Sequence, residues 1–560
     1  MYRKIRRRVL RFLEARATAA YAFIAGSRPA RWVCNQRSVR SVVRVLLLLW
    51  YLFINCIWQP VKKLVRRVRK FLGRHEVFPW LLTWAVCAGL GAVILQPLIF
   101  VRLAAGALAA ITFMLISFRL PLAGFLIWLL LSPLLNQLIR FKFLPGTPII
   151  TGDRVCLFIL LAVFLMQTRR ALKHERNTLL HLSMFVFVAT MLIATIPSAN
   201  PKWSAQSVLD AYMVPVIAYF LARAWVTNRR NLSLLFGIMI TVGVYFAVCA
   251  IPEHFLGRTL FKPTQWVEEE LGTVRVQGPA GTPTEFGVVV AAAAMLAITK
   301  FSGELRWSRR FLYAALAGLM LFGISLTLRR GVYVGVLAAF PIMLLASKGI
   351  RRTVAIMLAI GGLALLVSWQ ALIHSKVYSA RLSDPGPIYS RAAIQATAWN
   401  MIKHHPLSGV GVGNFGDVAP KFYMPFRDIS AFYGRGVISP HNQFLLVMVE
   451  GGMLAFVPFM FMILFIVLTS VRAYKAAEGH GLLGRDGVVV FWALTVAYLV
   501  QSVQGDGFWF CPYLTVLWYV FIGAMAGVHL LEREDQQVAR ACPSRVTYLH
   551  GGQAGQQTAS

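Results

Sequence analysis

The sequence predicts an all-α, polytopic membrane protein with about fourteen transmembrane helices. Of its 560 residues, 58% are hydrophobic and only 14% are charged, whereas a soluble domain carries about 25% charged residues. The hydrophobic residues also gather in blocks of roughly 17–25, the length that a helix needs to cross the hydrocarbon core of a bilayer. We therefore expect one integral membrane domain rather than several soluble domains.

The apolar blocks define the predicted crossings in order along the chain. They are approximately residues 78–100, 103–118, 120–139, 155–168, 179–197, 208–226, 232–251, 284–300, 311–327, 331–347, 353–372, 441–469, 487–504 and 512–531. A further apolar run at 45–58 is short for a crossing and has basic flanks, which favours an interfacial or re-entrant segment. Residues 1–77 thus form a basic N-terminal region, 78–531 the transmembrane domain and 532–560 a tail.

Charge gives the predicted bundle its orientation. If residues 60–76 are cytoplasmic and the crossings alternate, the cytoplasmic breaks are all basic, as in TRRALKHERN at 168–177 and SKGIRR at 347–352. The positive-inside rule then places both termini in the cytoplasm. Residues 373–440, the longest segment without a crossing, fall on the extracytoplasmic side, and we expect short helices within them.

The formal net charge of +36 narrows the class of partner. A basic excess suits nucleic acid, anionic lipid or an anionic substrate. Nucleic acid is disfavoured because most of this chain is expected to lie in lipid. The basic residues within 1–77 suit anionic lipid, and they serve equally well as a topology anchor. The seven cysteines are scattered without a CxxC pair, so we expect neither a disulfide framework nor a metal site.

Arginines on the predicted outer side are the first candidates for chemistry. Arg329 and Arg330 lie between two crossings where the positive-inside rule disfavours them, and Arg275 lies in an earlier outer loop. Arginine binds phosphate through a bidentate fork, so these residues suit a phosphate-bearing substrate. The alternative is that each arginine pairs with a nearby carboxylate, for which the candidates are Glu268, Glu285 and Glu450.

The long outer loop contains SRAAIQATAWNMIKHHPLSGVGVGNF at residues 390–415. Its first part predicts a short amphipathic helix that ends before Pro406, with Ile394, Ala398, Trp399 and Ile402 at helical spacing. The glycine-rich GVGVGNF that follows allows either a turn whose backbone N–H groups bind an anion or a flexible loop.

His441 lies in the stretch SPHN directly before a predicted crossing, at the outer membrane face. A histidine at the start of a membrane helix is frequently only interfacial. Imidazole is nevertheless the side chain best suited to accept a proton near neutral pH. Both interpretations stay open on position alone.

Four stretches together resemble the O-antigen ligase and polysaccharide polymerase family of bacterial integral membrane glycosyltransferases. They are RVQGPAGTPTEFGVVVA (275–291), LTLRRGVYVGVL (326–337), the 390–415 block and SPHNQFLLVMVEGGMLAF (439–456). The resemblance spans roughly residues 150–530, and Arg330 stands at the position of the family's motif arginine. Arg329 and Val332 depart from the small residues usual beside it.

The resemblance implies an inverting glycosyltransferase of the bacterial inner membrane that needs neither a metal nor a cofactor. The donor would be a glycan on polyprenyl diphosphate, and the acceptor would be another glycan or lipid A–core. His441 would remove the proton of the acceptor hydroxyl. The diphosphate would be held by Arg330, Arg275, Arg391 and Arg329. Supporting positions would be Asn442, Gly411, Gly413, Asn414 and Glu450.

Two other classes of protein remain open at this point. A transporter or flippase for lipid-linked glycan would carry charged residues deep within several helices, whereas the unusual polar groups here lie in outer loops. A peptidoglycan-polymerising enzyme of similar topology resembles this chain less. The sequence does not distinguish a ligase from a polymerase or from a protein-glycosylating enzyme, and it gives neither the sugar nor the oligomeric state.

Overall fold

The computed structural model describes residues 99–141, 150–167, 178–259, 268–270, 273–373, 386–423, 439–505 and 512–541. All of these belong to one compact unit, residues 89–560. The predictions for the region 1–77 and for the segment 45–58 lie outside the described residues, as do all but the last two residues of the first predicted crossing. The predicted tail is described only as far as Ala541.

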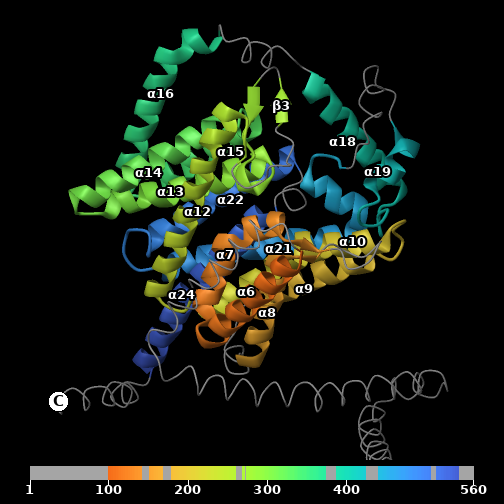
Figure 1. Ribbon diagram of the computed structural model, residues 1–560, viewed down its shortest axis with the longest axis horizontal. Coiled ribbons are helices and arrows are strands. Elements are labelled where there is room, and N and C mark those ends of the chain that lie inside the picture. The colour runs from red at the N-terminus through yellow and green to blue at the C-terminus, as the bar shows by residue number, and fades with distance from the viewer. Residues whose placement is uncertain are drawn as a thin grey trace, which may run out of the picture. The chain divides into compact units, whose positions relative to one another are not determined.

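Helices make up most of the described chain (Figure 1). They are α6 (Ile99–Arg119), α7 (Pro121–Leu138), α8 (Gly152–Gln167), α9 (Thr178–Ile193), α10 (Pro201–Val208), α11 (Val214–Trp225), α12 (Arg229–Leu256), α13 (Pro283–Gly303), α14 (Trp307–Ser325), α15 (Arg330–Ala346), α16 (Arg351–Ile373), α18 (Gly386–His404), α19 (Phe415–Val418), α21 (Gln443–Ala476), α22 (Arg485–Gln504) and α24 (Pro512–Ala541). A π-helical turn, η3 (Leu209–Met213), joins α10 to α11, and 3₁₀ turns form η4 (Gly278–Ala280) and η5 (Ala419–Phe422). A helix therefore occupies every crossing predicted from residue 103 onward.

Several of these helices are long and apolar enough to span a membrane. Within the described residues there are six, namely Pro201–Trp225, Arg229–Leu256, Pro283–Gly303, Gln443–Ala476, Arg485–Gln504 and Pro512–Leu530. Shorter apolar helices accompany them, among them Thr178–Ile193 and Arg330–Ala346. The chain is thus a helical, multi-pass membrane protein, but the predicted total of about fourteen crossings is not confirmed.

Two short antiparallel ladders add to the predicted all-α fold. Strand β1 (Arg140–Phe141) pairs with β2 (Ile150–Thr151), and β3 (Glu268–Glu270) pairs with β4 (Thr273–Arg275). Both ladders lie in segments that were predicted as outer loops. Hydrophobic periodicity did not reveal them because strands of two or three residues are too short to show an alternating pattern.

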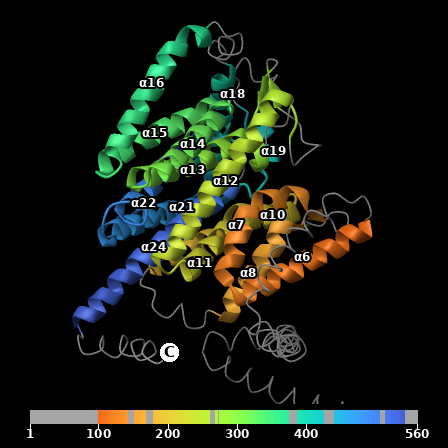
Figure 2. The ribbon, with the colours of Figure 1, turned by 60° about the vertical axis from the view of Figure 1, so that its left-hand side comes forward.

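The helices pack in pairs, with α11 against α24, α13 against α14 and α15 against α22. Of the six candidate spans, Pro512–Leu530 in α24 is the most buried, and its Trp518 and Tyr519 are fully buried. At the edge of this unit, α16 runs beside α15 (Figure 2) and exposes an apolar stripe. The stripe recurs at helical spacing, through Ile356, Ile360, Leu363 and Val367. Such a stripe suits contact with lipid.

Helix α21 is broken at Gly452, whose backbone has φ 62° and ψ −167°. This backbone region is open essentially to glycine alone. A Cβ at this position would lie 2.1 Å from the carbonyl oxygen of Leu407. A break in a membrane helix also frees backbone N–H and C=O groups, which must then find partners within the protein.

The chain after α18 supplies those partners. The carbonyls just before the break accept from the glycine-rich segment, and an N–H just after it donates back. The bonds are Val410 N–H to Val449 O (2.8 Å), Gly411 N–H to Glu450 O (3.0 Å) and Met453 N–H to Pro406 O (2.9 Å). The segment therefore braces the broken helix by replacing its missing hydrogen bonds.

Gly452→Ala is expected to lower the thermal stability of the protein markedly. A non-glycine residue in this backbone region costs about 1–3 kcal/mol, and the contact with the Leu407 carbonyl adds to that cost. The measurement is a thermal melt of the purified protein in detergent. Gly318→Ala is the matched control, because a Cβ on Gly318 in α14 meets nothing within 4 Å. Equal melting temperatures for the two variants would contradict the proposed brace.

Candidate active site

His441 occupies a tight turn directly before α21. Its backbone has φ 50°, in the left-handed region, where histidine is tolerated better than most side chains. Its N–H donates to the Ser439 hydroxyl at 3.2 Å. On the other side, the Asn442 side chain caps α21 by accepting the N–H groups of Phe444 (3.0 Å) and Leu445 (3.2 Å). These bonds hold the backbone of His441 in the turn, and Asn442 acts as a helix cap.

Two arginines converge on His441 from separate parts of the chain. Arg391 comes from α18, and Arg329 precedes α15. Burial lowers the pKa of His441 most, and the positive charges of Arg391 and Arg329 lower it further, to about 4. The imidazole is consequently neutral at physiological pH and can accept a proton. Three residues singled out from the sequence thus lie within electrostatic reach of one another.

The turn between α14 and α15 places Arg329 and Arg330 in different surroundings. Leu328 has φ 48°, a rare conformation for a bulky side chain that costs about 1–3 kcal/mol and is typical of functional sites. Arg329 follows it and is half-buried, whereas Arg330 begins α15 and is exposed. The resemblance placed the motif arginine at Arg330, yet Arg329 is the one whose charge acts on His441.

Within the glycine-rich segment, residues 410–414 form a hydrogen-bonded stretch. Its consecutive N–H groups all donate within the protein: those of residues 410 and 411 to α21, Val412 to Ala194 O (3.0 Å), Gly413 to the Glu450 carboxylate (2.8 Å) and Asn414 to Gly411 O (3.3 Å). The Asn414 side chain accepts from the Ser198 hydroxyl (3.0 Å) and the Ala199 N–H (3.1 Å). These contacts tie the segment to the chain just after α9, and the N–H groups of residues 410–414 are already used within the protein.

Helix α18 brings Arg391 to the site by packing on the first turns of α21. Ile394, Ala398 and Ile402 are buried as predicted, within a cluster that includes Leu445 and Leu446. The prediction for Trp399 is wrong, because its side chain is 50% exposed. Each helical residue advances about 100° around the axis, so the residue after Ala398 turns away from the buried face.

Residues 315–460 match the O-antigen ligase family. This range holds Arg329, Arg391, His441 and the braced break of α21. Over these residues the chain is similar to O-antigen ligases. The family match confirms the resemblance inferred from the sequence, and this family implies a membrane enzyme of the glycosyltransferase kind. The match covers about a quarter of the chain, and no curated protein matches it.

The end of α22 contributes two residues that sequence reasoning missed. A Cβ on Gly331 would lie 2.6 Å from the Gln504 side-chain oxygen and 3.1 Å from that of Gln501. The side-chain ends of both glutamines therefore lie close to the backbone directly after Arg329 and Arg330. Gln501 is buried, with 2% of its surface exposed. The signal in the sequence was two amides at the end of an apolar crossing, where uncompensated polar groups are costly.

Arg275 reaches the ligase domain through the loop before α13. Its neighbour Val276 donates an N–H to Leu326 O at 3.5 Å, which joins the loop to the end of α14. The loop is anchored further by the Glu253 carboxylate, which accepts the N–H groups of Gln277 (2.9 Å) and Gly278 (2.8 Å). In the β3–β4 register, Arg275 stands opposite Glu268, one of the residues named above as its alternative partner.

The other two candidate carboxylates accept backbone N–H groups. Glu285 accepts the N–H groups of Tyr513 (2.6 Å) and Leu514 (3.0 Å) at the start of α24. Glu450 accepts the N–H of Gly413. A carboxylate buried at a helix N-terminus is stabilised by the dipole and the exposed N–H groups there. These contacts give Glu285 a structural role as a cap for α24.

Proposed function

We propose that the protein transfers a glycan from a polyprenyl-diphosphate donor to an acceptor hydroxyl on the extracytoplasmic face of the bacterial inner membrane. The convergence of Arg329 and Arg391 on His441, within an O-antigen ligase domain, carries this proposal. The acceptor is lipid A–core if the enzyme is a ligase and another glycan unit if it is a polymerase. Either role serves O-antigen or exopolysaccharide assembly.

The arginines suit the leaving group of this reaction. As the bond between sugar C1 and the phosphate oxygen breaks, negative charge grows on the polyprenyl diphosphate. Guanidinium groups placed before the reaction stabilise that charge strongly where water is excluded. Arg329 and Arg391 come from different segments, so together they can grip the diphosphate from two sides. Two cations at this position support a mechanism that does not depend on a metal ion.

The histidine suits the attacking group. The acceptor oxygen forms a bond to C1 on the face opposite the leaving group, which inverts the configuration, and its proton passes to the neutral ring of His441. A bound diphosphate offsets the field of Arg329 and Arg391 at the imidazole. Its pKa should then rise toward the ordinary value. Donor binding would therefore make His441 a stronger base at the moment when the base is needed.

A reconstituted transfer assay tests this function. The protein is purified in nanodiscs and given a polyprenyl-diphosphate-linked glycan with either lipid A–core or a second repeat unit. We expect a glycosylated product and free polyprenyl diphosphate, both in the presence of a metal chelator. Activity that the chelator abolishes would contradict the metal-free mechanism. Movement of donor across proteoliposomes without transfer would favour a flippase instead.

A further inference from the structure

A cavity of about 340 Å³ opens among the ends of α7, α8, α13 and α24, beside the turns η3 and η4. Its volume lies in the lower part of the range for small-ligand sites, about 300–1,000 Å³. The predicted topology places all of these helix ends on the same side as His441. Its lining does not include His441, Arg329 or Arg391.

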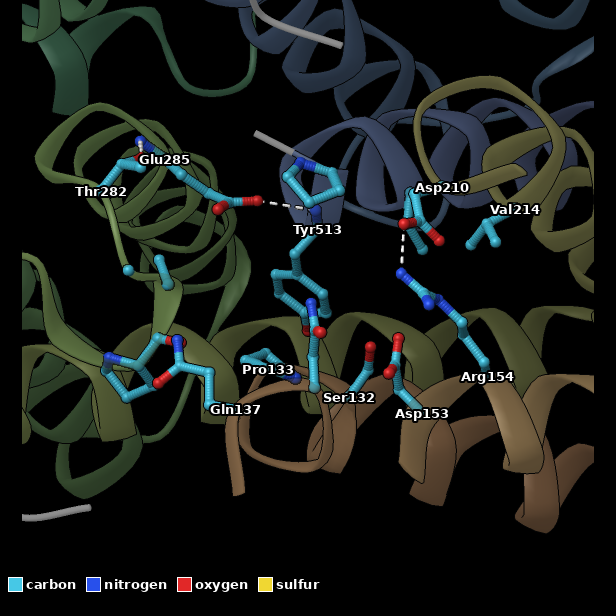
Figure 3. Close-up of a pocket in the computed structure, with 16 residues that line it drawn as sticks. Ser132, Pro133, Gln137, Asp153, Arg154, Asp210, Val214, Thr282, Glu285 and Tyr513 are labelled. Atoms are coloured by element: carbon cyan, nitrogen blue, oxygen red, sulfur yellow. Dashed lines mark hydrogen bonds and ion pairs between the residues drawn. The ribbon is translucent and has the colours of Figure 1, made fainter. Parts of the chain in front are cut away.

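An ion pair between Arg154 of α8 and Asp210 of η3 forms one wall (Figure 3). Asp210 also accepts a hydrogen bond from the Gln206 side chain. It belongs to the π-helical turn Leu209–Met213, an irregularity within the otherwise regular helical span Pro201–Trp225. Such turns are rare and frequently mark functional sites, because they redirect a side chain at some cost in helix regularity.

The lining favours an uncharged polar ligand. Arg154 is the one cationic side chain of this lining and already pairs with Asp210, which disfavours a diphosphate. The position beside Asp210 that a cation would take is already filled by Arg154. Hydroxyl and amide groups complete the polar lining, from Ser132, Asn136, Gln137 and Thr282. Apolar surface is supplied by Pro279, Ala280, Val214 and Val516.

Carboxylates, amides and hydroxyls beside apolar side chains are typical of a site that binds a sugar. Sugar hydroxyls donate to carboxylates and accept from amide and guanidinium groups, while the C–H faces of the ring pack on apolar side chains. Some of these polar groups already have partners within the protein, such as Asp210 with Arg154 and the Thr282 hydroxyl with the Glu285 N–H, but carboxylate and hydroxyl oxygens can each accept further hydrogen bonds. A neutral sugar ring can satisfy both kinds of surface at once.

Two connections join the cavity to the candidate active site. The Tyr212 hydroxyl, from the same π-helical turn as Asp210, accepts from the side chain of Gln443 at 3.4 Å. Gln443 begins α21, two residues after His441. On the other side, the loop that carries Arg275 continues directly into η4, whose Pro279 and Ala280 line the cavity. The cavity thus adjoins the segments on which His441 and Arg275 lie.

We propose that the cavity is a sugar subsite that binds an uncharged ring of the glycan substrate, while the arginines hold the diphosphate. The proposal rests on the proposed function and adds a substrate-recognition site to it. The ring belongs either to the donor glycan or to the acceptor. A blocked cavity should raise the Michaelis constant of the donor in the first case and that of the acceptor in the second.

Ala280→Phe is the principal test, because it fills the cavity without removing a charged group. Val334→Phe is the matched control, on an exposed face of α15. Asp210→Asn removes the charge that holds Arg154. The probes are the oligosaccharide released by mild acid from the surface polysaccharide of the source cells, which carries neither lipid nor diphosphate, and inorganic pyrophosphate. Binding of each is measured calorimetrically on purified protein after a thermal melt.

Ala280→Phe and Asp210→Asn are expected to weaken oligosaccharide binding about tenfold or more, with pyrophosphate affinity unchanged. In the transfer assay, one Michaelis constant should rise with little change in kcat: the donor's if the ring belongs to the donor, the acceptor's otherwise. Oligosaccharide binding that is undetectable in the parent protein, or unchanged in a folded Ala280→Phe, would overturn the subsite. Failure of the parent protein to transfer glycan, with oligosaccharide binding intact, would instead count against the proposed function.

Discussion

His441→Ala is expected to reduce glycan transfer by about 10²–10⁴, the usual contribution of a general base. The loss should fall on kcat, because the base acts on the acceptor hydroxyl and leaves the diphosphate contacts in place. Lipid-linked donor should accumulate in cells that carry the variant. The measurement is the initial rate of transfer from a polyprenyl-diphosphate donor, at equal amounts of folded protein.

The control must preserve the unusual backbone of this position. Alanine is disfavoured at φ 50°, so some loss of stability in His441→Ala would follow from the turn alone. Asparagine tolerates the left-handed conformation and lacks a basic nitrogen, which makes His441→Asn the cleaner variant. If His441 is merely packed at the headgroup level, a folded His441→Asn should transfer glycan at nearly the rate of the parent.

The pH profile gives a second readout of the same residue. The pKa of His441 is lowered to about 4 in the free protein, so the ring should stay neutral, and kcat/KM should keep its value, from pH 7 down to about pH 5. Below that range protonation removes the base, and the rate should fall. An acid limb near the ordinary histidine pKa of about 6.5 would show that neither burial nor the arginines lower the pKa of the ring.

The helices could be predicted from the sequence, because long apolar blocks between basic breaks leave few alternative structures in a membrane. The break in α21 could not be predicted. The sequence shows Glu450-Gly451-Gly452, but the backbone of Gly452 depends on hydrogen bonds from a segment some forty residues earlier. Periodicity describes one helix at a time and cannot report a brace between distant segments.

The candidate site could be predicted only in part, because the sequence does not show contacts between distant segments. Its residue types and its order along the chain follow from the motifs, and three of the chosen residues do meet. The roles of their neighbours depend on local geometry. Asn442 is adjacent to the histidine and looked like a second polar site group, yet its side chain caps α21. Gln501 was missed because its contact with the arginine turn joins helices far apart in sequence.

The distinction between Arg329 and Arg330 leads to the last prediction. Arg329→Ala and Arg391→Ala are each expected to lower the rate of transfer by about 10²–10³, the typical cost of removing one preorganised donor to a developing charge. Arg330→Ala should have a smaller effect, because Arg330 is exposed. Arg329→Lys should also be impaired, since lysine lacks the fork that matches phosphate. Arg352→Ala, which removes an exposed charge at the start of α16, controls for general electrostatics.

The pH profile separates a direct role of these arginines from a structural one. Each arginine lowers the pKa of His441, so its removal should raise that pKa and move the acid limb of kcat/KM to higher pH. A variant that only weakens the fold would lose activity at all pH values without such a shift. If Arg330→Ala were the more damaging variant and moved the limb, the diphosphate would have to approach from the exposed side of the turn, with Arg330 as its principal ligand.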